Sequence, residues 1–95
     1  MPQLEDKVAI ITGAAQGIGR AVAKSYVQEG AKVVVADLLA DEAAVLCDEL
    51  NSEYGSSNLP VAIPVATDVS DKSSVNDMVA RTLEAFGRID ILVNN

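Results

Sequence analysis

The sequence of 95 residues predicts an α/β fold, in which helices cover both faces of a parallel sheet. Short apolar runs alternate with stretches of helical periodicity, and glycine or polar residues separate them. Such alternation is typical of parallel strands joined by right-handed helical crossovers, the doubly wound arrangement. Apolar residues make up 49% of the chain, which is enough for a core, and the length corresponds to one small domain.

Four apolar runs are predicted to be strands. Residues 7–12 and 32–37 are short, rich in β-branched side chains and nearly all apolar, as expected of strands buried on both faces. Residues 61–66 and 89–94 complete the set. Pro64 favours an edge position for the third strand, because proline lacks the N–H that a central strand would donate. The predicted strand order is therefore 3-2-1-4, in a sheet that is truncated after its fourth strand.

Three helices are predicted between these strands. The first begins at Ile18 and stops at Gly30, and the second spans residues 40–53. The third follows a predicted N-cap at Ser70 and ends at Gly87. The residues expected on their inner faces are Ile18, Ala21, Val22, Ser25 and Tyr26 in the first, Ala43, Leu46, Cys47 and Leu50 in the second, and Val75, Met78, Val79, Thr82, Leu83 and Phe86 in the third.

Charge and composition narrow the possible functions. The net charge of −7 and an aromatic content of 3% disfavour nucleic acid and anionic membranes as partners. The chain has no histidine, which excludes a Ser-His-Asp triad, a Cys-His dyad and most zinc sites. We expect no metal site. The single cysteine, Cys47, is predicted to be a core thiol in a reducing compartment. Asp41, Glu42, Asp48 and Glu49 are expected to form a solvated acidic face.

The first eleven residues lack the basic region of a signal peptide, and no apolar stretch approaches 18 residues. We therefore expect a soluble, cytoplasmic protein.

Residues 12–19, with the sequence TGAAQGIG, place three glycines between a predicted strand and a predicted helix. The N-terminus of a helix has unpaired N–H groups and a partial positive charge, which attract phosphate. Gly13 would permit a tight turn, Gly17 a close approach of the backbone to a pyrophosphate, and Gly19 close packing of the helix on the sheet. A purely structural turn is the alternative reading of this loop.

Asp37 ends the second predicted strand, where a carboxylate can accept hydrogen bonds from the hydroxyls of an adenosine ribose. A solvated acid at a strand end is the alternative. A 2′-phosphate beside Asp37 would be repelled by about 4 kcal/mol per pair of unit charges, at ~4 Å and an effective dielectric of ~20. The neighbouring Leu38 and the loop residue Gln16 are neutral and do not offset this repulsion. The sequence therefore predicts NAD in preference to NADP.

Four motifs together resemble the N-terminal half of the short-chain dehydrogenases/reductases, in the branch with a TGxxxGxG loop. They are that loop, Asp68-Val69, residues 86–90 (FGRID) and residues 92–95 (LVNN). The resemblance runs from Lys7 to Asn95. It implies that residues 1–95 are the incomplete, NAD-binding half of a Rossmann-type oxidoreductase domain. The whole protein would transfer hydride between an alcohol or ketone and the nicotinamide, as a homo-oligomer.

The resemblance also implies roles for single residues. Asp68 and Val69 would line the adenine pocket, although the residues alone equally allow Asp68 to begin a cap for the third helix. Asn94 would start the N-N-A-G segment, which steadies the sheet and flanks the cofactor; a frayed terminus is the alternative. Arg20 is expected to be exposed, or to help neutralise the pyrophosphate. The predicted cofactor-binding residues are Gly13, Gln16, Gly17, Ile18, Gly19, Asp37, Leu38, Asp68, Val69 and Asn94.

The catalytic residues that the resemblance implies are missing from this sequence. The family uses a serine and a tyrosine followed four residues later by lysine, which the phenol needs because its unperturbed pKa, ~10, makes it a poor base near neutral pH. Gly30 follows Tyr26 by four residues, and Asn58 follows Tyr54. We therefore predict no catalytic residue among these 95 residues, no turnover by this chain alone, and a partial chain.

A non-catalytic NAD-binding module or assembly partner is the alternative function. A methyltransferase that uses adenosylmethionine is a more remote one, disfavoured by the glycine spacing and by the Asp68-Val69 and Asn94-Asn95 pairs.

Overall fold

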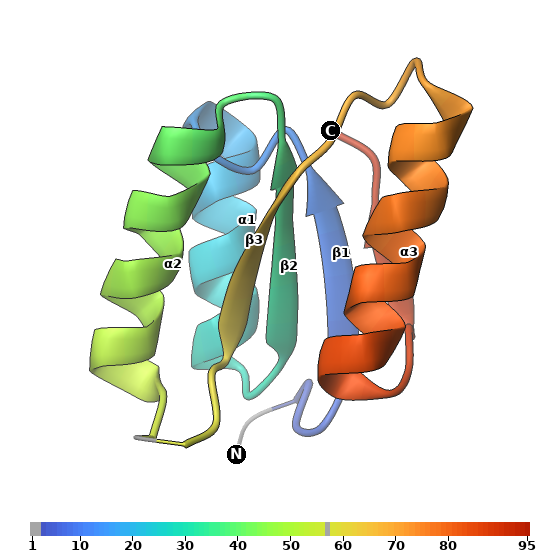
Figure 1. The fold of residues 1–95 in the computed structure, drawn as a ribbon. Coiled ribbons are helices and arrows are strands. Elements are labelled where there is room, and N and C mark those ends of the chain that lie inside the picture. Colours follow the sequence, from blue (N-terminus) through green and yellow to red (C-terminus); the bar gives the residue numbers. More distant parts are fainter. Residues whose placement is uncertain (1–2, 57) are drawn as a thin grey trace.

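The computed structural model describes residues 3–56 and 58–95, over which four parallel strands alternate with three helices (Figure 1). Met1, Pro2 and Ser57 lie outside the described residues; Ser57 belongs to the loop that was predicted between the second helix and the third strand. Among the helices of this described part, none has the length and apolar character needed to cross a membrane.

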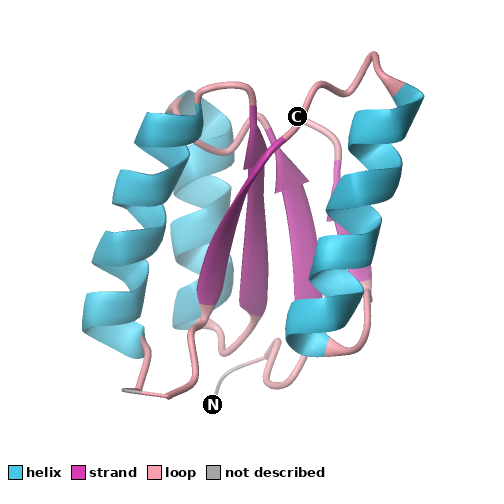
Figure 2. Cartoon of the chain, viewed as in Figure 1, coloured by secondary structure: helices cyan, strands magenta, loops and turns pink. Residues whose placement is uncertain are grey.

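The predicted fold class and strand order are confirmed. The sheet has the order β3-β2-β1-β4, with β1 at Val8–Thr12, β2 at Lys32–Asp37, β3 at Ala62–Ala66 and β4 at Ile91–Val93. The helices are α1 (Gly17–Gln28), α2 (Ala40–Tyr54) and α3 (Lys72–Phe86). Because all strands run in parallel, their carboxyl ends lie at one edge of the sheet, as the arrowheads show in Figure 2.

The core has one layer on each face of the sheet. Ala9 and Ile11 of β1 pack with the buried side chains of α1 and α2, whereas Ile10 packs with Met78 of α3. Figure 1 shows α1 and α2 on one face and α3 on the other. All five residues of β1 are buried. Burial on both faces explains why this strand is a continuous apolar run rather than an alternating one.

The buried face of α2 is the predicted one, since Ala43, Leu46, Cys47 and Leu50 are all buried. Burial, and secondarily the neighbouring Asp48 carboxylate, raises the pKa of the Cys47 thiol to about 12. The thiolate is the reactive form of cysteine, so this side chain is an inert part of the core.

The predicted inner face of α1 is largely wrong. The buried residues are Gly19, Ala23 and Val27, while Ile18 is 76% exposed and the predicted Ala21 and Ser25 are also exposed. Only Val22 and Tyr26 of the predicted set pack against the core. Two of the three buried residues are a glycine and an alanine, whose contact with the sheet a pattern of large apolar residues does not reveal.

The predicted start of α3 is also wrong. Asp71, not Ser70, is the N-cap, and its carboxylate accepts a hydrogen bond from the N–H of Ser73 at 3.0 Å. On the predicted inner face Leu83 is exposed, because it lies about 100° around the helix from the buried Thr82. The other five inner residues are buried or packed against the core, and Gly87 ends the helix with a φ of 78°.

The predicted bounds of β2 are confirmed, and those of the other strands differ by one or two residues, most clearly for β4, which spans Ile91–Val93 rather than 89–94. The cause lies at Asp90, whose Oδ2 accepts the N–H of Val8 at 2.9 Å. The backbone N–H of Asp90 still donates to the carbonyl of Val8 at 2.9 Å, so the side chain replaces only the second of the two bonds that a longer strand would make to Val8.

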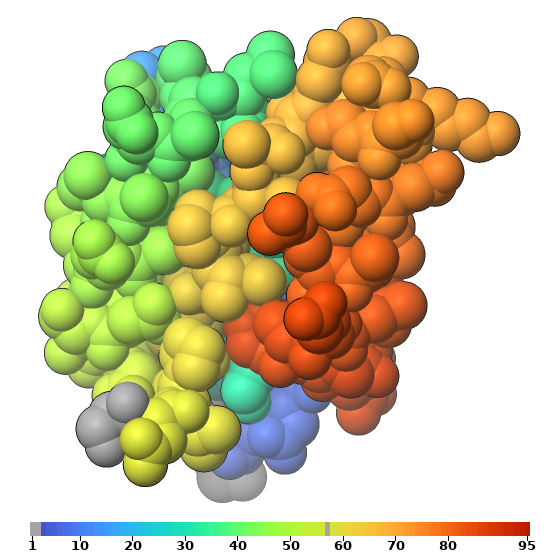
Figure 3. All heavy atoms as spheres, viewed as in Figure 1, coloured from blue at the N-terminus to red at the C-terminus, as the bar shows by residue number. Residues whose placement is uncertain are grey.

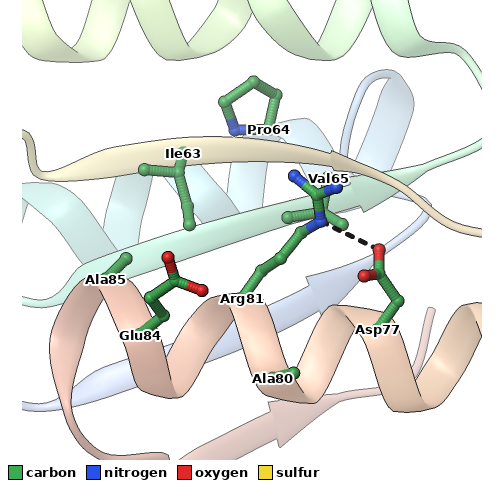
Figure 4. Close-up of a pocket in the computed structure, with 8 residues that line it drawn as sticks. All are labelled: Ile63, Pro64, Val65, Asp77, Ala80, Arg81, Glu84 and Ala85. Atoms are coloured by element: carbon green, nitrogen blue, oxygen red, sulfur yellow. Dashed lines mark hydrogen bonds and ion pairs between the residues drawn. The ribbon is translucent and has the colours of Figure 1, made fainter.

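A hollow of about 610 Å³ separates the edge strand β3 from α3 (Figures 3 and 4). Figure 4 shows Ile63 and Arg81 pointing into it, with Arg81 paired to Asp77 at 2.9 Å. Pro64 lies on β3, and the edge position predicted from this proline is confirmed.

Asn51 links α2 to the start of β3. Its Nδ2 donates to the carbonyl of Ala62 at 2.9 Å, and its Oδ1 accepts the N–H groups of Val61 and Ala62 at 2.8 and 3.0 Å. We predict that Asn51→Ala lowers the free energy of unfolding by about 1–3 kcal/mol, because these half-buried backbone groups lose their partner. Urea denaturation measures the change. The same substitution at Asn76, exposed on α3, should change it by less than about 0.5 kcal/mol; equal effects would contradict this role.

Asp90 makes the stability dependent on pH. Its Oδ1 pairs with Nη2 of Arg88 at 2.8 Å, and this hydrogen bond, followed by the one from Val8, holds the pKa of the carboxyl below its usual value. The folded-state pKa is therefore lower than the unfolded one, about 3.9. The stabilisation is present above that value and is lost as the pH falls through the folded-state pKa.

We predict that Asp90→Asn lowers the stability at pH 7, and that its difference from the parent protein shrinks as the pH falls from about 5 towards 2. Denaturation at a series of pH values measures this. A difference that does not vary with pH would show that the carboxylate charge is not the cause.

Candidate functional site

Most of the predicted site residues gather at the carboxyl edge of the sheet. A cleft of about 180 Å³ opens there, and the ends of all four strands contribute to it. Its lining residues are Thr12, Gly13, Ala36, Asp37, Leu38, Thr67, Asp68, Val69, Asn94 and Asn95. The larger hollow between β3 and α3 shares no lining residue with this cleft and contains none of the predicted site residues. We therefore take the cleft as the candidate site, although it is smaller.

The loop between β1 and α1 forms one side of the cleft. Gly13 has a φ of 63° and Gly17 a φ of 59°, a left-handed conformation that other residues adopt only at a cost. The N–H of Gly13 donates to the carbonyl of Ala36 at 2.8 Å, which ties the loop to the end of β2. A Cβ added at Gly17 would meet no atom of the described residues within 4 Å, so this position is open to a ligand.

Gly19 serves a different purpose from Gly17. A Cβ at Gly19 would collide with the carbonyl oxygen of Gly13 and lie 2.7 Å from Nδ2 of Asn95 and 2.9 Å from Cα of Ala14. Helix α1 therefore lies against the loop and the end of the chain at a distance that only glycine permits. Of the predicted residues, Gly19 is buried beneath the site, and Ile18 lies exposed beside it.

Asn95 belongs to the site and was missed by the sequence prediction. Its Nδ2 donates to the carbonyl of Gly13 at 3.1 Å, and its N–H donates to Oγ1 of Thr12 at 3.1 Å. The signal for it was the pairing of β4 with β1, because residues that follow adjacent parallel strands lie side by side. The prediction used both asparagines as a family motif but assigned only Asn94 to the site.

Thr12 joins the ends of β1 and β4. Its buried hydroxyl lies 3.3 Å from the carbonyl oxygen of Val93 and 3.4 Å from Oδ1 of Asn94, and it accepts the N–H of Asn95. One hydroxyl proton serves one acceptor at a time, so the first two contacts are alternatives. These contacts hold Asn94 in place beside the cleft.

Asp37 connects the glycine loop with the turn that leads into α2. Its Oδ2 accepts the N–H of Ala15 at 3.0 Å, and its Oδ1 accepts the N–H of Leu39 at 2.9 Å. A carboxylate has about four acceptor sites, so both oxygens can accept a further bond from a ligand. The side chain therefore shapes the loop and still presents acceptors to the cleft.

Asp68 forms a turn of its own rather than capping α3. Its Oδ1 accepts the hydroxyl of Ser70 at 2.6 Å and the N–H of Ser70 at 2.9 Å. The hydroxyl bond is the larger of the two effects that lower the pKa of the Asp68 carboxyl. With Asp71 as the cap, Asp68 stays at the cleft beside the exposed Val69.

Two polar contacts connect α1 and its preceding loop to α2. Nε2 of Gln16 donates to Oε2 of Glu42 at 2.6 Å, and Nη2 of Arg20 pairs with Oε2 of Glu49 at 2.8 Å. Gln16 and Gly17 lie not in the cleft but in an adjoining hollow of about 470 Å³, with Arg20, Asp41 and Glu42. All four acids of the predicted acidic face are exposed, and two of them have partners in or next to α1.

The model of the short chain dehydrogenase family matches residues 7–95, nearly the whole chain. The chain belongs to this family. Among its relatives are a sorbitol dehydrogenase of Cereibacter sphaeroides, 44% identical over 98% of this chain and 33% of that protein, and a trans-4-hydroxycyclohexanecarboxylate dehydrogenase of Sinomonas cyclohexanicum, 42% identical over 98% and 36%. The chain thus spans about a third of the length of these relatives.

Two solved structures share the fold closely. A 3-ketoacyl-(acyl-carrier-protein) reductase from Brucella melitensis, complexed with NADH, has a TM-score of 0.84 and 39% identity over 95% of this chain and 34% of that one. A short chain dehydrogenase/reductase from Burkholderia phymatum, in complex with NAD, has a TM-score of 0.86 and 37% identity over 97% and 31%. The Rossmann-type fold implied by the resemblance is thereby confirmed.

We predict that Gly19→Ala destabilises the protein more than Gly17→Ala does. The first substitution forces a methyl group against backbone atoms, whereas the second adds it in open space and strains only φ, by about 1–2 kcal/mol. Urea denaturation of both variants measures the difference. If Gly17→Ala were the more damaging of the two, the close approach of α1 at Gly19 would not be what holds the loop.

Proposed function

We propose that residues 1–95 are the NAD-binding part of a short-chain oxidoreductase whose whole length transfers hydride between an alcohol or ketone and the nicotinamide. The observation that carries the proposal is the cleft at the carboxyl edge, where the glycine loop and Asp37 meet at the start of α1. The NADH and NAD in the two structural neighbours support it.

The residues present fit a dinucleotide. The pyrophosphate would lie at the start of α1, where Gly17 leaves open space and the first turn contains no acidic residue.

The ribose hydroxyls would donate to Asp37, and the adenine would lie between Leu38 and the Asp68-Val69 pair. Gln16, Ile18 and Asn94 would flank the ligand, and Gly13 and Gly19 would shape the loop. The bound cofactor supplies the hydride acceptor or donor.

The charge of Asp37 supports NAD over NADP, because a 2′-phosphate would be placed against a carboxylate that is already fixed by two N–H groups. Arg20, which was considered as a partner of the pyrophosphate, is paired with Glu49. Its positive charge is thereby offset, so α1 itself supplies most of the attraction for the phosphates.

For these 95 residues alone we propose binding without turnover. Neither Tyr26 nor Tyr54 is followed by a lysine at the fourth position, and this supports a catalytic site outside them. A non-catalytic NAD-binding module is the second candidate, favoured by the same observation. The buried thiol of Cys47 supports a reducing, cytoplasmic location. We also propose that the whole protein is a homo-oligomer, and the exposed Leu83 on α3 offers apolar surface for such a contact.

Calorimetric titration with NAD and NADP tests the proposal. We expect the chain to bind NAD, and to bind NADP at least tenfold more weakly, since even a partly screened charge repulsion exceeds about 1.4 kcal/mol. No heat of binding with NAD would contradict the proposed site. Oxidation of NADH by the pure chain, with ketones as substrates, would contradict the absence of turnover.

Gly17→Ala separates binding from folding. We predict that this variant unfolds in one transition like the parent protein but binds NAD at least tenfold more weakly, because the new methyl group occupies the open space over the helix N-terminus. Calorimetry at a temperature well below the unfolding transition measures this. Unchanged affinity would show that the phosphates bind elsewhere.

A further inference from the structure

We propose that Glu42, in the first turn of α2, is a second determinant of the preference for NAD, distinct from Asp37. Glu42 would disfavour a 2′-phosphate on the ribose in two ways. Its negative charge would repel the phosphate, and its carboxylate holds the side-chain amide of Gln16. The proposal deepens the proposed function of this site and rests on it.

The position follows from three contacts. Asp37, the predicted acceptor of the ribose hydroxyls, accepts the N–H of Ala15 at 3.0 Å. A ribose bound to Asp37 would therefore lie close to Gln16, the residue after Ala15. Nε2 of Gln16 is 2.6 Å from Oε2 of Glu42. Ala15, Gln16 and Glu42 also line one hollow of about 470 Å³ next to the cleft. A 2′-phosphate on a ribose bound to Asp37 would therefore lie towards this hollow.

The two helix N-termini near the site carry opposite charge patterns. Both would attract an anion through the partial positive charge of a helix N-terminus. The first turn of α1 contains no acidic residue, whereas that of α2 contains Asp41 and Glu42. The N-terminus of α1 thus keeps its partial positive charge and can attract the pyrophosphate, whereas the two acids offset that of the N-terminus of α2. Acidic residues in a first turn also stabilise their own helix. That effect does not explain why Glu42 contacts the glycine loop.

Gln16 is the neutral residue of the loop that could donate to a 2′-phosphate. Its amide instead donates to a carboxylate, and a hydrogen bond to a charged acceptor is stronger than one between neutral groups. Glu42 thereby removes a donor from the hollow and adds a negative charge to it. Both effects disfavour NADP, and neither affects the free ribose hydroxyls of NAD.

The substitution Glu42→Gln isolates the charge. The amide oxygen of a glutamine can still accept the bond from Gln16, so the loop keeps its contact while one negative charge is lost. The matched control is Asp48→Asn, which removes the same charge from an exposed position farther along α2. Glu42→Ala removes both the charge and the acceptor, and it frees the amide of Gln16.

Calorimetric titration with NAD and with NADP, at low salt (about 50 mM) so that surface charges are felt, gives the ratio of the two dissociation constants for each variant. We expect Glu42→Gln to shift this ratio towards NADP by about three- to tenfold, and Glu42→Ala to shift it further. Asp48→Asn should shift it by less than about twofold.

The outcomes separate this inference from the function on which it rests. If the parent protein binds NAD but Glu42→Gln shifts the ratio no more than Asp48→Asn does, the role of Glu42 is wrong and the proposed function stands. If Glu42→Ala shifts the ratio no further than Glu42→Gln, the part played by Gln16 is wrong. If the parent protein binds neither dinucleotide, the proposed function fails, and this inference fails with it.

Discussion

The structure depends on the contact of Gly19 with the carbonyl of Gly13 and the side-chain amide of Asn95. No side chain fits between these atoms, so α1 approaches the end of β1 more closely than other residues would allow. This approach directs the N-terminus of α1 across the carboxyl edge of the sheet. The same edge collects Asp37, Asp68 and Asn94, because every strand of a parallel sheet ends there.

Several side chains at this edge have two roles, one in the fold and one proposed for the ligand. Asp37 holds the glycine loop through Ala15 while keeping acceptors for a ribose. Asn94, which contacts the hydroxyl of Thr12 at the end of β1, is also proposed to flank the ligand. A substitution aimed at cofactor preference therefore also alters the loop. Glu42 differs in this respect, since it is exposed and touches the site only through Gln16.

The sequence predicted what apolar periodicity and glycine spacing encode, and it failed where small or polar side chains make the contact. The strand order and the buried face of α2 followed from large apolar residues and Pro64. The inner face of α1 did not. Its buried residues, Gly19, Ala23 and Val27, each come one position after a predicted one, because glycine and alanine carry a weaker hydrophobic signal than the larger residues before them. Asn95 and the bond from Ala15 to Asp37 were missed for another reason. They join residues more than twenty positions apart, and the prediction did not carry the strand order through to contacts between the residues at the ends of neighbouring strands.

The central claim is that the carboxyl edge, and not the larger hollow beside α3, is the dinucleotide site. Titration of NAD into uniformly ¹⁵N-labelled protein, followed through the amide resonances, tests it most directly. The account predicts shifts at Gly13, Gly17, Leu38, Val69 and Asn95, with the amides of Ile63 and Arg81 unchanged. Shifts confined to Ile63, Arg81 and their neighbours, or no shifts at all, would contradict it.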